Sequence, residues 1–329
     1  MERNGSNSTP QSEVLITDSP EHPSKRVRSS EENKDNGTGA VAAHEVMETK
    51  FKNRSLDVVP VELPTTEISL PEPAKSSAGQ PESGWPEKVR VFTWNIAECI
   101  PSASAPGWSK ACDGWDSSVA HMYIVATIIS MDADIVCLQE APSASFSFDE
   151  SAYVLLGSER SHCGYVQLFV RHFLLRLLIS SFVVGPAVCA SFVDGITIAS
   201  MHLQPFPGEV NGQKRVKQLQ NVRKQGQESF IFAGDANMRN NDATAFRRTE
   251  SGIIDVHDDL NNGTPPTWNT YVNKYHANSK EYTCNFDRIF LGGRFKAEEC
   301  HVVCNTPASE RPHHFLSDHF GLLATVIRQ

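Results

Sequence analysis

The sequence predicts an α+β domain in which two packed mixed β-sheets are flanked by helices, behind a disordered N-terminal tail. Many short apolar runs of strand length follow one another with few helical patterns between them, which is typical of packed sheets. Residues 1–84 contain one aromatic side chain, Phe51, and no cysteine, whereas all five Trp, all six Tyr and all eight Cys lie beyond them. Such a tail cannot bury enough apolar surface to offset chain entropy. We therefore expect a tail at 1–84 and one folded domain at 85–329.

Four of the apolar runs predict strands whose last residues are polar. These strands cover residues 89–95, 135–140, 196–202 and 230–235. The longest uncharged run, 177–193, is interrupted by Gly185-Pro186 and is too short to span a membrane. We expect it to form two buried strands joined by a turn, and we expect no membrane span.

Two segments have the apolar spacing of amphipathic helices. Residues 116–130 predict one helix, with Asp116 as its N-cap, and residues 213–225 predict another. The apolar side chains of the second helix should face inward; they are Val216, Leu219 and Val222. Its basic side chains should point largely outward; they are Lys214, Arg215, Lys217, Arg223 and Lys224. The first three could form a local basic patch with Arg239, Arg247 and Arg248, although a solvated face explains them equally well.

Six polar clusters follow apolar runs in a fixed order. They are Thr93-Trp94-Asn95, Leu138-Gln139-Glu140, Met201-His202-Leu203, Gly234-Asp235-Ala236-Asn237, Asn285-Phe286-Asp287-Arg288 and Ser317-Asp318-His319. Polar side chains at strand ends can be assembled into one active site from distant segments. Because Mg²⁺ prefers carboxylate oxygen ligands, the clusters predict a divalent-metal phosphoesterase. We expect Glu140 to bind Mg²⁺ directly, with Mn²⁺ able to substitute; the alternative is an ordinary surface glutamate.

The fourth cluster offers a base and an amide two residues apart. On an extended strand end, the side chains of Asp235 and Asn237 would point the same way. Asp235 could then orient and deprotonate a water molecule while the Asn237 amide fixes the phosphate. The alternative is a Gly-Asp turn that closes the strand. For His202, the alternative is a purely structural histidine.

The order and chemistry of these clusters resemble the endonuclease/exonuclease/phosphatase superfamily, with its DNase I-like fold, over residues 89–327. A narrower resemblance to the tyrosyl-DNA phosphodiesterase 2 family rests on five motifs: Thr93–Ile96, Gly234–Arg239, Thr267–Thr270, Phe286–Phe290 and Ser317–Leu322. Together they make a stronger signal than any one motif alone. The resemblance implies a four-layer αββα sandwich.

The resemblance also implies roles for individual residues. Asp287 would orient His319 and keep it charged, and Asp318 would lie beside the metal. His202 would contact the phosphate from the other side. Asn95 would help to hold Glu140, a metal-bound water or the phosphate.

The narrower resemblance implies a substrate: the 5′-phosphotyrosyl bond that a trapped topoisomerase leaves on a DNA end, mainly a single-stranded 5′ end with a tyrosine or peptide adduct. Arg239 and Trp268 would line the groove for that end, and Tyr165 matches a groove segment more weakly. One alternative is an apurinic endonuclease, an exonuclease or another phosphoesterase of the superfamily, acting on RNA or a phospholipid headgroup. Another is a pseudoenzyme that only binds a partner.

Three departures from the family pattern bear on the substrate. Ala97 stands where the family has an acidic residue, Leu203-Gln204-Pro205 replaces Leu-Glu-Ser, and the chain is shorter between residues 170 and 200.

The tail holds 9 of the 30 basic and 14 of the 39 acidic residues, which leaves the domain with 21 basic and 25 acidic residues, a net charge of −4. Proteins that bind along a long DNA duplex are usually basic. The net negative charge of the domain therefore favours binding of only a few nucleotides at a DNA end.

Cysteine usage and the tail bear on location and partners. Residues 1–39 contain no apolar run of secretory length, and eight cysteines without such a signal predict reduced thiols in the nucleus and/or cytoplasm. Lys25–Arg28 is a candidate import signal or a solvated charge run. Segment 40–63 has a weak apolar pattern that could bind an unknown protein or form an unfolded linker. Cys300–Cys304 has no second half of a zinc site, so a strand that packs two cysteines is favoured.

Overall fold

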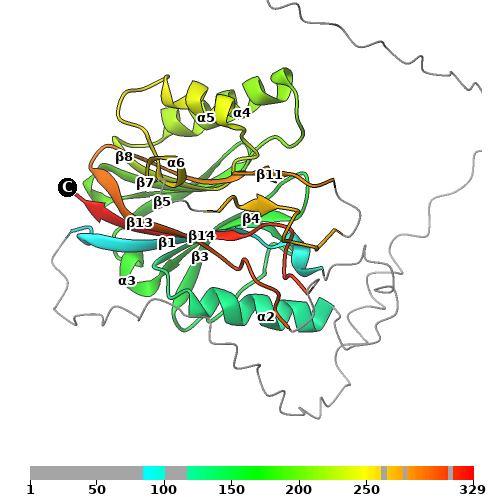
Figure 1. Ribbon diagram of the computed structural model, residues 1–329. Helices are drawn as coiled ribbons and strands as arrows, with labels where there is room; N and C mark the ends of the chain where they lie inside the picture. The colour runs from blue at the N-terminus through cyan, green and yellow to red at the C-terminus, as the bar shows by residue number, and fades with distance from the viewer. Residues whose placement is uncertain (1–83, 101–116, 261–264, 277–279, 310–313) are drawn as a thin grey trace, which may run out of the picture. The chain divides into compact units, whose positions relative to one another are not determined.

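In the computed structural model, residues 84–100, 117–260, 265–276, 280–309 and 314–329 are described, and two six-stranded sheets form their centre (Figure 1). The first sheet has the order β13-β14-β1-β2-β4-β3. Its strands are β1 Lys88–Asn95, β2 Ile135–Ala141, β3 Tyr153–Arg160, β4 Tyr165–Arg171, β13 Phe295–Val303 and β14 Gly321–Arg328. The tail predicted for residues 1–84 lies outside the described residues except for Gly84, and it stays a prediction.

The second sheet has the order β5-β6-β7-β8-β12-β9. Its strands are β5 Leu178–Val184, β6 Ala187–Phe192, β7 Ile196–His202, β8 Ser229–Asp235, β9 Ile254–Asp255 and β12 Asp287–Gly292. Both sheets are mixed, because β1 runs parallel to β2 and β7 runs parallel to β8, whereas the other pairs are antiparallel. A separate two-stranded sheet joins β10 Trp268–Asn269 to β11 Thr283–Cys284.

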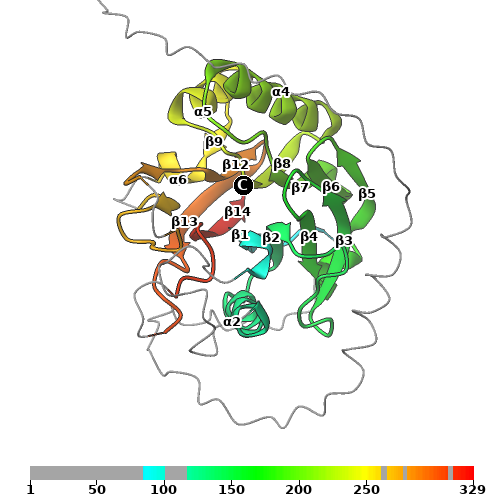
Figure 2. The ribbon, with the colours of Figure 1, turned by 90° about the vertical axis from the view of Figure 1, so that its right-hand side faces the viewer.

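Alternating side chains bury both faces of the central strands. In β1, Val91 packs in the apolar cluster shared by the two sheets, and Phe92 packs on the other face with helix α2, Ser117–Ser130. In β8, Ile231 joins the shared cluster, and Phe232 packs with helices α4 Glu209–Gln225 and α5 Asn240–Arg247. The layers α2, first sheet, second sheet and α4 with α5 confirm the predicted αββα sandwich (Figures 1 and 2).

The remaining elements are short. They are η1 Ala97–Cys99, α3 His172–Leu175, η2 Val193–Gly195 and α6 Val256–Asp259. In η1, Ala97, Glu98 and Cys99 have φ values of 46°, 54° and 54°. Three consecutive non-glycine residues in the left-handed region are unusual, and this turn directly follows the end of β1.

Both predicted helices form, with two corrections. The N-cap predicted at Asp116 lies outside the described residues and stays a prediction. The first correction is that the second helix begins at Glu209 rather than Gln213. Gly212 and Asn211 are weak helix formers, which hid the first turn of α4 from the sequence pattern. Arg215 was expected to point outward, but its side chain is buried. It donates to Asp242 Oδ2 from Nε at 3.0 Å and from Nη2 at 2.8 Å, and thereby ties α4 to α5.

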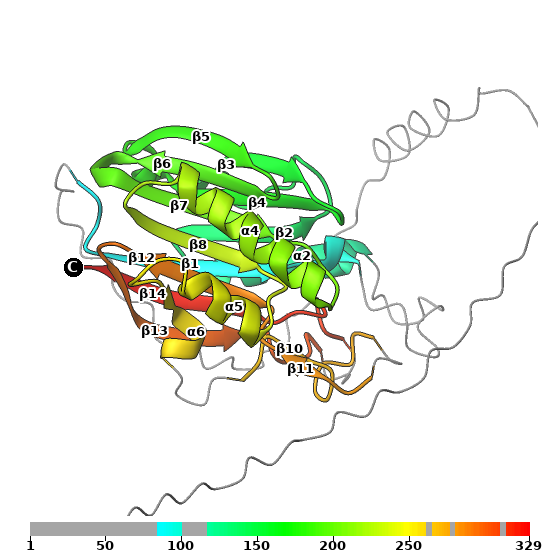
Figure 3. The same ribbon diagram turned by 90° about the horizontal axis from the view of Figure 1, so that it is seen from above.

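The run 177–193 forms β5 and β6 with a turn at Gly185, as predicted, but only β6 is buried. β5 lies at the outer edge of its sheet (Figure 3), and its side chains Ile179 and Val183 are exposed. The prediction of two buried strands is therefore wrong for β5, whose Phe182 and Val184 pack only partly against the cluster under α4 and α5.

The segment Cys300–Cys304 lies at the end of a strand. Cys300 lies within β13 and Cys304 directly follows it, so the strand interpretation is confirmed. Among the described residues, seven cysteines are free thiols. In the same part of the chain, no helix combines the length and apolar character that a membrane crossing requires.

Candidate active site

The ends of the two parallel strand pairs bring predicted site residues together. Asn95 ends β1 opposite Gln139, and Glu140 follows in β2. His202 ends β7 directly opposite Asp235, the last residue of β8. Parallel strands end at the same edge of a sheet, so the polar clusters meet at one edge of the sandwich. Asp287 joins them because β12 runs antiparallel to β8 and pairs its first residue with Asp235.

Hydrogen bonds join the segment Ser317–His319 to the end of β1. Trp94 Nε1 donates to the His319 carbonyl at 3.0 Å, and Ser317 Oγ donates to the Asn95 carbonyl at 2.6 Å. The backbone amide of His319 donates back to Ser317 Oγ at 3.1 Å. Trp94 and Ser317, which are both buried, therefore fix the position of the histidine.

Asn95 connects the two sheets through its side chain. Its Nδ2 donates to Glu140 Oε1 at 3.1 Å and to Asp235 Oδ2 at 3.2 Å, and its Oδ1 accepts from the backbone amide of Ala97 at 3.1 Å. Because these bonds use both amide protons, they fix which end of the amide faces the carboxylates. The structure thus gives Asn95 the contact with Glu140 that the resemblance implied.

Glu140 has an unusual backbone conformation. Its φ is 52°, and the pairing of β2 with β4 is irregular between Leu138 and Ala141. The turn before β4 packs directly on the backbone of Glu140 through Gly164, whose φ is 58°. A Cβ on Gly164 would lie 2.7 Å from Glu140 Cα and 2.8 Å from the Ala141 carbonyl oxygen. Only glycine fits there. Strained backbone of this kind is often found at functional sites.

The Glu140 carboxyl lies in a negative environment. Burial is the largest cause that raises its pKa, and the charges of Asp318 and Asp235 raise it further against the hydrogen bond from Asn95, to about 7. A cation beside these carboxylates would remove this repulsion and favour the ionised form.

His319 is paired with a buried carboxylate. Its Nδ1 lies 2.8 Å from Asp287 Oδ2, and its Nε2 lies 3.7 Å from Asp235 Oδ2. Burial disfavours the imidazolium, but the charges of Asp287 and Asp235 outweigh it and raise the pKa of His319 well above its usual value. The two carboxylates therefore favour the charged imidazolium of His319.

His202 approaches Asp235 from the other side. Its Nε2 lies 3.4 Å from Asp235 Oδ2 and 3.8 Å from Glu140 Oε1, and its Nδ1 lies 3.2 Å from Ser161 Oγ. Burial is the dominant cause that lowers the pKa of His202 to about 4, although the Asp235 charge acts in the opposite direction. This imidazole is therefore neutral.

Asn237 reaches the site by a different local geometry from the one expected. The predicted reason was strand alternation, but Asn237 has a φ of 51° and lies beyond the end of β8. Its backbone amide donates to Asp235 Oδ1 at 2.8 Å, which closes the Gly-Asp turn that was the alternative interpretation. Its Nδ2 donates to the Leu203 carbonyl at 3.3 Å. The turn therefore fixes Asp235, and the extended-strand argument is wrong.

Asp318 has a histidine partner that the sequence did not reveal. His276 Nε2 lies 2.8 Å from Asp318 Oδ2. Burial alone would raise the pKa of Asp318, but this contact and the charge of His319 lower it. The hydrogen bond to Asp318 is also the largest cause that raises the pKa of His276. No motif surrounds His276, so only the folded chain could place it.

Arg239 and Trp268 flank the histidine side of the site, with Phe286 between them. The Trp268 ring packs edge-on against His319 at 4.8 Å and against Phe286 at 5.6 Å. The Arg239 guanidinium lies 4.9 Å from the Phe286 ring centroid, and its Nη1 donates to the Asn237 carbonyl at 2.8 Å. An aromatic face and a cation thus lie next to the predicted reaction centre.

Tyr165 lies on the opposite flank. It begins β4 and pairs with Ala141, one residue after Glu140. Its partly buried ring packs against the apolar cluster between the first sheet and α2. This packing places part of the ring in the core, and its expected role in a groove stays a prediction.

Two groups of side chains in the described structure could hold a metal ion. One contains Glu140, His162 and His202, and the other contains Asp235, Asp287 and His319. Sequence reasoning missed His162, which is exposed and lies in the turn between β3 and β4. The wider site also fits a divalent cation by charge, because two histidines with raised pKa values face four carboxylates; these are Glu140, Asp235, Asp287 and Asp318.

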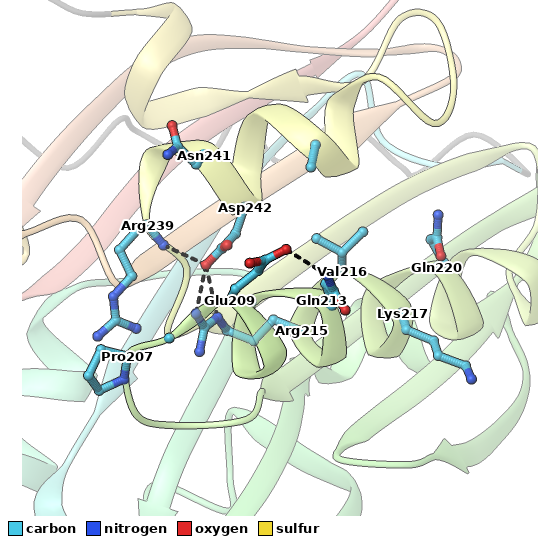
Figure 4. A pocket seen from close by; sticks show the side chains of 13 residues that line it. Pro207, Glu209, Gln213, Arg215, Val216, Lys217, Gln220, Arg239, Asn241 and Asp242 are labelled. Atoms are coloured by element: carbon cyan, nitrogen blue, oxygen red, sulfur yellow. Dashed lines mark hydrogen bonds and ion pairs between the residues drawn. The ribbon is translucent and has the colours of Figure 1, made fainter. Parts of the chain in front are cut away.

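A separate hollow of about 640 Å³ lies between α4 and α5 (Figure 4). Arg239, Lys217 and Asp242 are among its lining residues, whereas Glu140, Asp235 and His319 are not. In Figure 4, the Arg215 guanidinium and the Arg239 backbone both point at the Asp242 carboxylate. This hollow therefore adjoins the strand-end site through Arg239 but is not the reaction centre.

Comparison with known proteins assigns the chain to a family. The sequence profile of the Endonuclease/Exonuclease/phosphatase family matches residues 92–319. Human tyrosyl-DNA phosphodiesterase 2 is 32% identical over 145 residues, which cover 40% of this chain and 38% of the human protein, and the Bos taurus protein is 30% identical over the same length. The match thus spans well under half of these relatives.

Solved structures show the same fold. A humanised D. rerio tyrosyl-DNA phosphodiesterase 2 superposes with a TM-score of 0.55 at 19% identity, covering 73% of this chain and 99% of the other. A D. rerio structure described as complexed with single-strand DNA product gives 0.54 at 18% identity, with coverage of 73% and 99%. With the profile match over more than half of its length, the chain belongs to the endonuclease/exonuclease/phosphatase family.

Proposed function

We propose that this chain is a Mg²⁺-dependent phosphodiesterase that also accepts Mn²⁺ and hydrolyses 5′-phosphotyrosyl bonds at DNA ends in the nucleus and/or cytoplasm. The proposal rests on one oxygen atom, Asp235 Oδ2, which three side chains approach. Asp235 Oδ2 lies 3.2 Å from the Asn95 amide, 3.4 Å from His202 and 3.7 Å from His319. A carboxylate held between a neutral and a charged imidazole is well placed for proton transfer beside a phosphate.

Glu140 is the proposed metal ligand, with Asp318 close by. The carboxylate oxygens of these two side chains suit Mg²⁺ better than softer ions. When bound, Mg²⁺ would supply positive charge that offsets negative charge developing on the phosphate and the leaving oxygen. Asn95 holds the Glu140 carboxylate in place through its 3.1 Å hydrogen bond.

The protein groups divide the remaining tasks. Asp235 orients a water molecule and accepts its proton, while the His319 cation stabilises the phosphate oxygens in the transition state. Asp287 acts through His319, because it contacts the imidazole at Nδ1. Asn237 uses one amide proton for the Leu203 carbonyl, and its second proton is available for a phosphate oxygen.

Preference for a phosphotyrosyl DNA end rests on the flank formed by Trp268, Phe286 and Arg239. Stacking on aromatic side chains and contact with a cation is how many proteins bind single-stranded nucleic acid. The names of the two mammalian relatives and of the D. rerio complex support this substrate class. The tail, whose partner we propose to be another protein, takes no part in this argument.

The test is a product analysis with three substrates. The full-length protein and Mg²⁺ or Mn²⁺ are incubated with a single-stranded oligonucleotide bearing a 5′-phosphotyrosine, an abasic duplex and an inositol phosphate. Release of tyrosine with the 5′-phosphate left on DNA is expected, and Glu140→Ala and Asp235→Asn should abolish it. Asp259→Asn is the matched control, because Asp259 forms an exposed ion pair with Arg247 away from the strand ends.

The other outcomes separate the alternatives. Cleavage of the abasic duplex or the inositol phosphate instead would keep the metal-site chemistry and overturn the phosphotyrosyl substrate. Lack of turnover on all three substrates, by a folded protein that binds Mg²⁺, would favour a pseudoenzyme.

A further inference from the structure

The turn between β3 and β4 places a histidine at the mouth of the site. His162 is exposed, and its ring lies 4.2 Å from the His202 ring, centroid to centroid, at an interplanar angle of 53°. Each of Glu140, His162 and His202 offers one ligand atom, and these three atoms lie within 4.8 Å of one another. Two nitrogen ligands and one oxygen ligand thus lie close enough together to share one ion.

This arrangement is held by the backbone. The Ser161 amide donates to the Gly164 carbonyl at 3.0 Å, which closes the turn around His162. Gly164 in turn packs directly on the Glu140 backbone, where a Cβ would lie 2.7 Å from Glu140 Cα. The position of His162 relative to Glu140 is therefore set by contacts between two backbones.

Ser161 also fixes which nitrogen of His202 is free to bind an ion. Its hydroxyl donates to the Cys163 carbonyl at 2.6 Å, so its oxygen accepts from His202 Nδ1 at 3.2 Å. His202 Nε2 then carries a lone pair, and it lies 3.8 Å from Glu140 Oε1 and 3.4 Å from Asp235 Oδ2. A hydrogen-bonded Nδ1 that leaves Nε2 free is the usual state of a metal-binding histidine.

We propose that Glu140, His162 and His202 form a second metal site that selects a transition-metal ion, Zn²⁺ foremost, over Mg²⁺. Imidazole nitrogen suits Zn²⁺, whereas Mg²⁺ prefers oxygen ligands. Three protein ligands leave one position of a tetrahedral Zn²⁺ ion for water. Because Glu140 belongs to this site and to the proposed Mg²⁺ site, Zn²⁺ bound here competes with Mg²⁺ and inhibits the phosphodiesterase; this consequence alone rests on the proposed function.

The first test measures Zn²⁺ binding to the full-length chain by competition with a chromophoric chelator at pH 7. Removing the outer partner of a metal ligand already costs about 10–100-fold in affinity, so His162→Ala should weaken Zn²⁺ binding at least about tenfold. His172→Ala is the matched control: this exposed histidine lies beyond the opposite end of β4. The measured quantity is the difference in Zn²⁺ affinity between the two variants. Zn²⁺ bound elsewhere in the chain contributes equally to both and does not affect this difference.

Co²⁺ gives a second readout that does not depend on activity. The visible absorption of tetrahedral Co²⁺ should appear in the wild type and in His172→Ala, and it should be lost in His162→Ala. Equal Zn²⁺ affinity in the two variants, or a Co²⁺ spectrum unchanged by His162→Ala, would overturn the site.

An activity measurement separates this inference from the proposed function. Zn²⁺ should inhibit Mg²⁺-supported phosphotyrosyl hydrolysis at lower concentration in the wild type than in His162→Ala. If His162→Ala binds Zn²⁺ more weakly than His172→Ala but the protein hydrolyses none of the substrates, the zinc site is supported and the proposed function is rejected. Hydrolysis without a binding difference rejects the zinc site alone.

Discussion

His202 and His319 approach the same oxygen of Asp235, at 3.4 Å and 3.7 Å, yet they differ in charge. Both side chains are buried, at 1% and 6% exposure, so solvent does not distinguish them. The pKa of His202 is lowered to about 4 by burial, whereas the pKa of His319 is raised well above its usual value by Asp287 and Asp235 despite burial.

The partner of the second ring nitrogen explains the difference. His202 Nδ1 contacts the neutral Ser161 hydroxyl, and His319 Nδ1 contacts the Asp287 carboxylate. A carboxylate at Nδ1 outweighs the cost of burying the imidazolium of His319. A hydroxyl at Nδ1 does not offset that cost for His202, whose pKa the charges of His162 and His319 lower further. One strand-end carboxylate can therefore serve a neutral histidine and a cationic one, and the roles follow from the outer partner rather than from residue type.

Removing the shared carboxylate should have the largest effect, because both histidines depend on it. Asp235→Asn deletes the proposed base and a charge that raises the pKa of both imidazoles. General acid–base catalysis contributes about 10²–10⁴-fold, and we expect kcat for phosphotyrosyl hydrolysis to fall about 10³-fold. Steady-state kinetics on the 5′-phosphotyrosyl oligonucleotide measure this, and retention of more than a tenth of the rate would exclude Asp235 as the base.

Asp287→Asn should make His319 resemble His202. The amide cannot stabilise the imidazolium as a carboxylate does, so the pKa of His319 should drop toward or below its ordinary value. We expect a loss in kcat between about 10² and 10³-fold, typical of removing charge stabilisation in a transition state. Histidine NMR titration of the purified variant measures the shift, with the His202 resonance as internal control. An unshifted His319 would contradict the pairing.

Acid between pH 6.5 and 4 should destabilise the protein through His202 and should leave the charge of His319 unchanged. The folded pKa of His202 is lowered from 6.5 to about 4, so its contribution to stability is complete above pH 6.5 and is lost as the pH falls toward 4. A shift of this size corresponds to about 3 kcal/mol. His319 is already charged throughout that window, because its pKa is raised.

Denaturant unfolding between pH 7 and 4 tests this linkage. The stability of the wild type relative to His202→Asn should decrease by about 3 kcal/mol over the window. A difference that does not change with pH would show that His202 is not held neutral in the folded protein.

Ser161→Ala should give the smallest effect and acts on the His202 side alone. The substitution removes the hydrogen bond between Ser161 Oγ and His202 Nδ1, whose net contribution to stability is about 1 kcal/mol. The His202 imidazole is then free to change tautomer. We expect an increase in KM or a fall in kcat of less than about tenfold, with the His319 titration unchanged. Ser145→Ala, an exposed serine outside the site, is the control for urea unfolding and kinetics. A shift of the His319 pKa in Ser161→Ala would break the separation between the two sides.

The sequence by itself determined the strands and the polar residues at their ends. The runs before Asn95, Glu140, His202 and Asp235 are buried strands, because alternation and strand length are local properties. The same pattern predicted the sandwich and the helices α2 and α4. It could not assign a partner to a buried side chain, and the burial of Arg215 against Asp242 was missed for that reason.

Only the tertiary structure decided which groups meet and in what charge state. Asn95 bonds to Asp235 across 140 residues, and Trp94 to the His319 carbonyl across 225. His162 and His276 carry no local signal, yet one joins Glu140 and the other joins Asp318. Hydrogen bonds and pKa values depend on distances between segments far apart in the chain, whereas strand periodicity depends on near neighbours, and this is why the sequence supplied the residues and the fold supplied their roles.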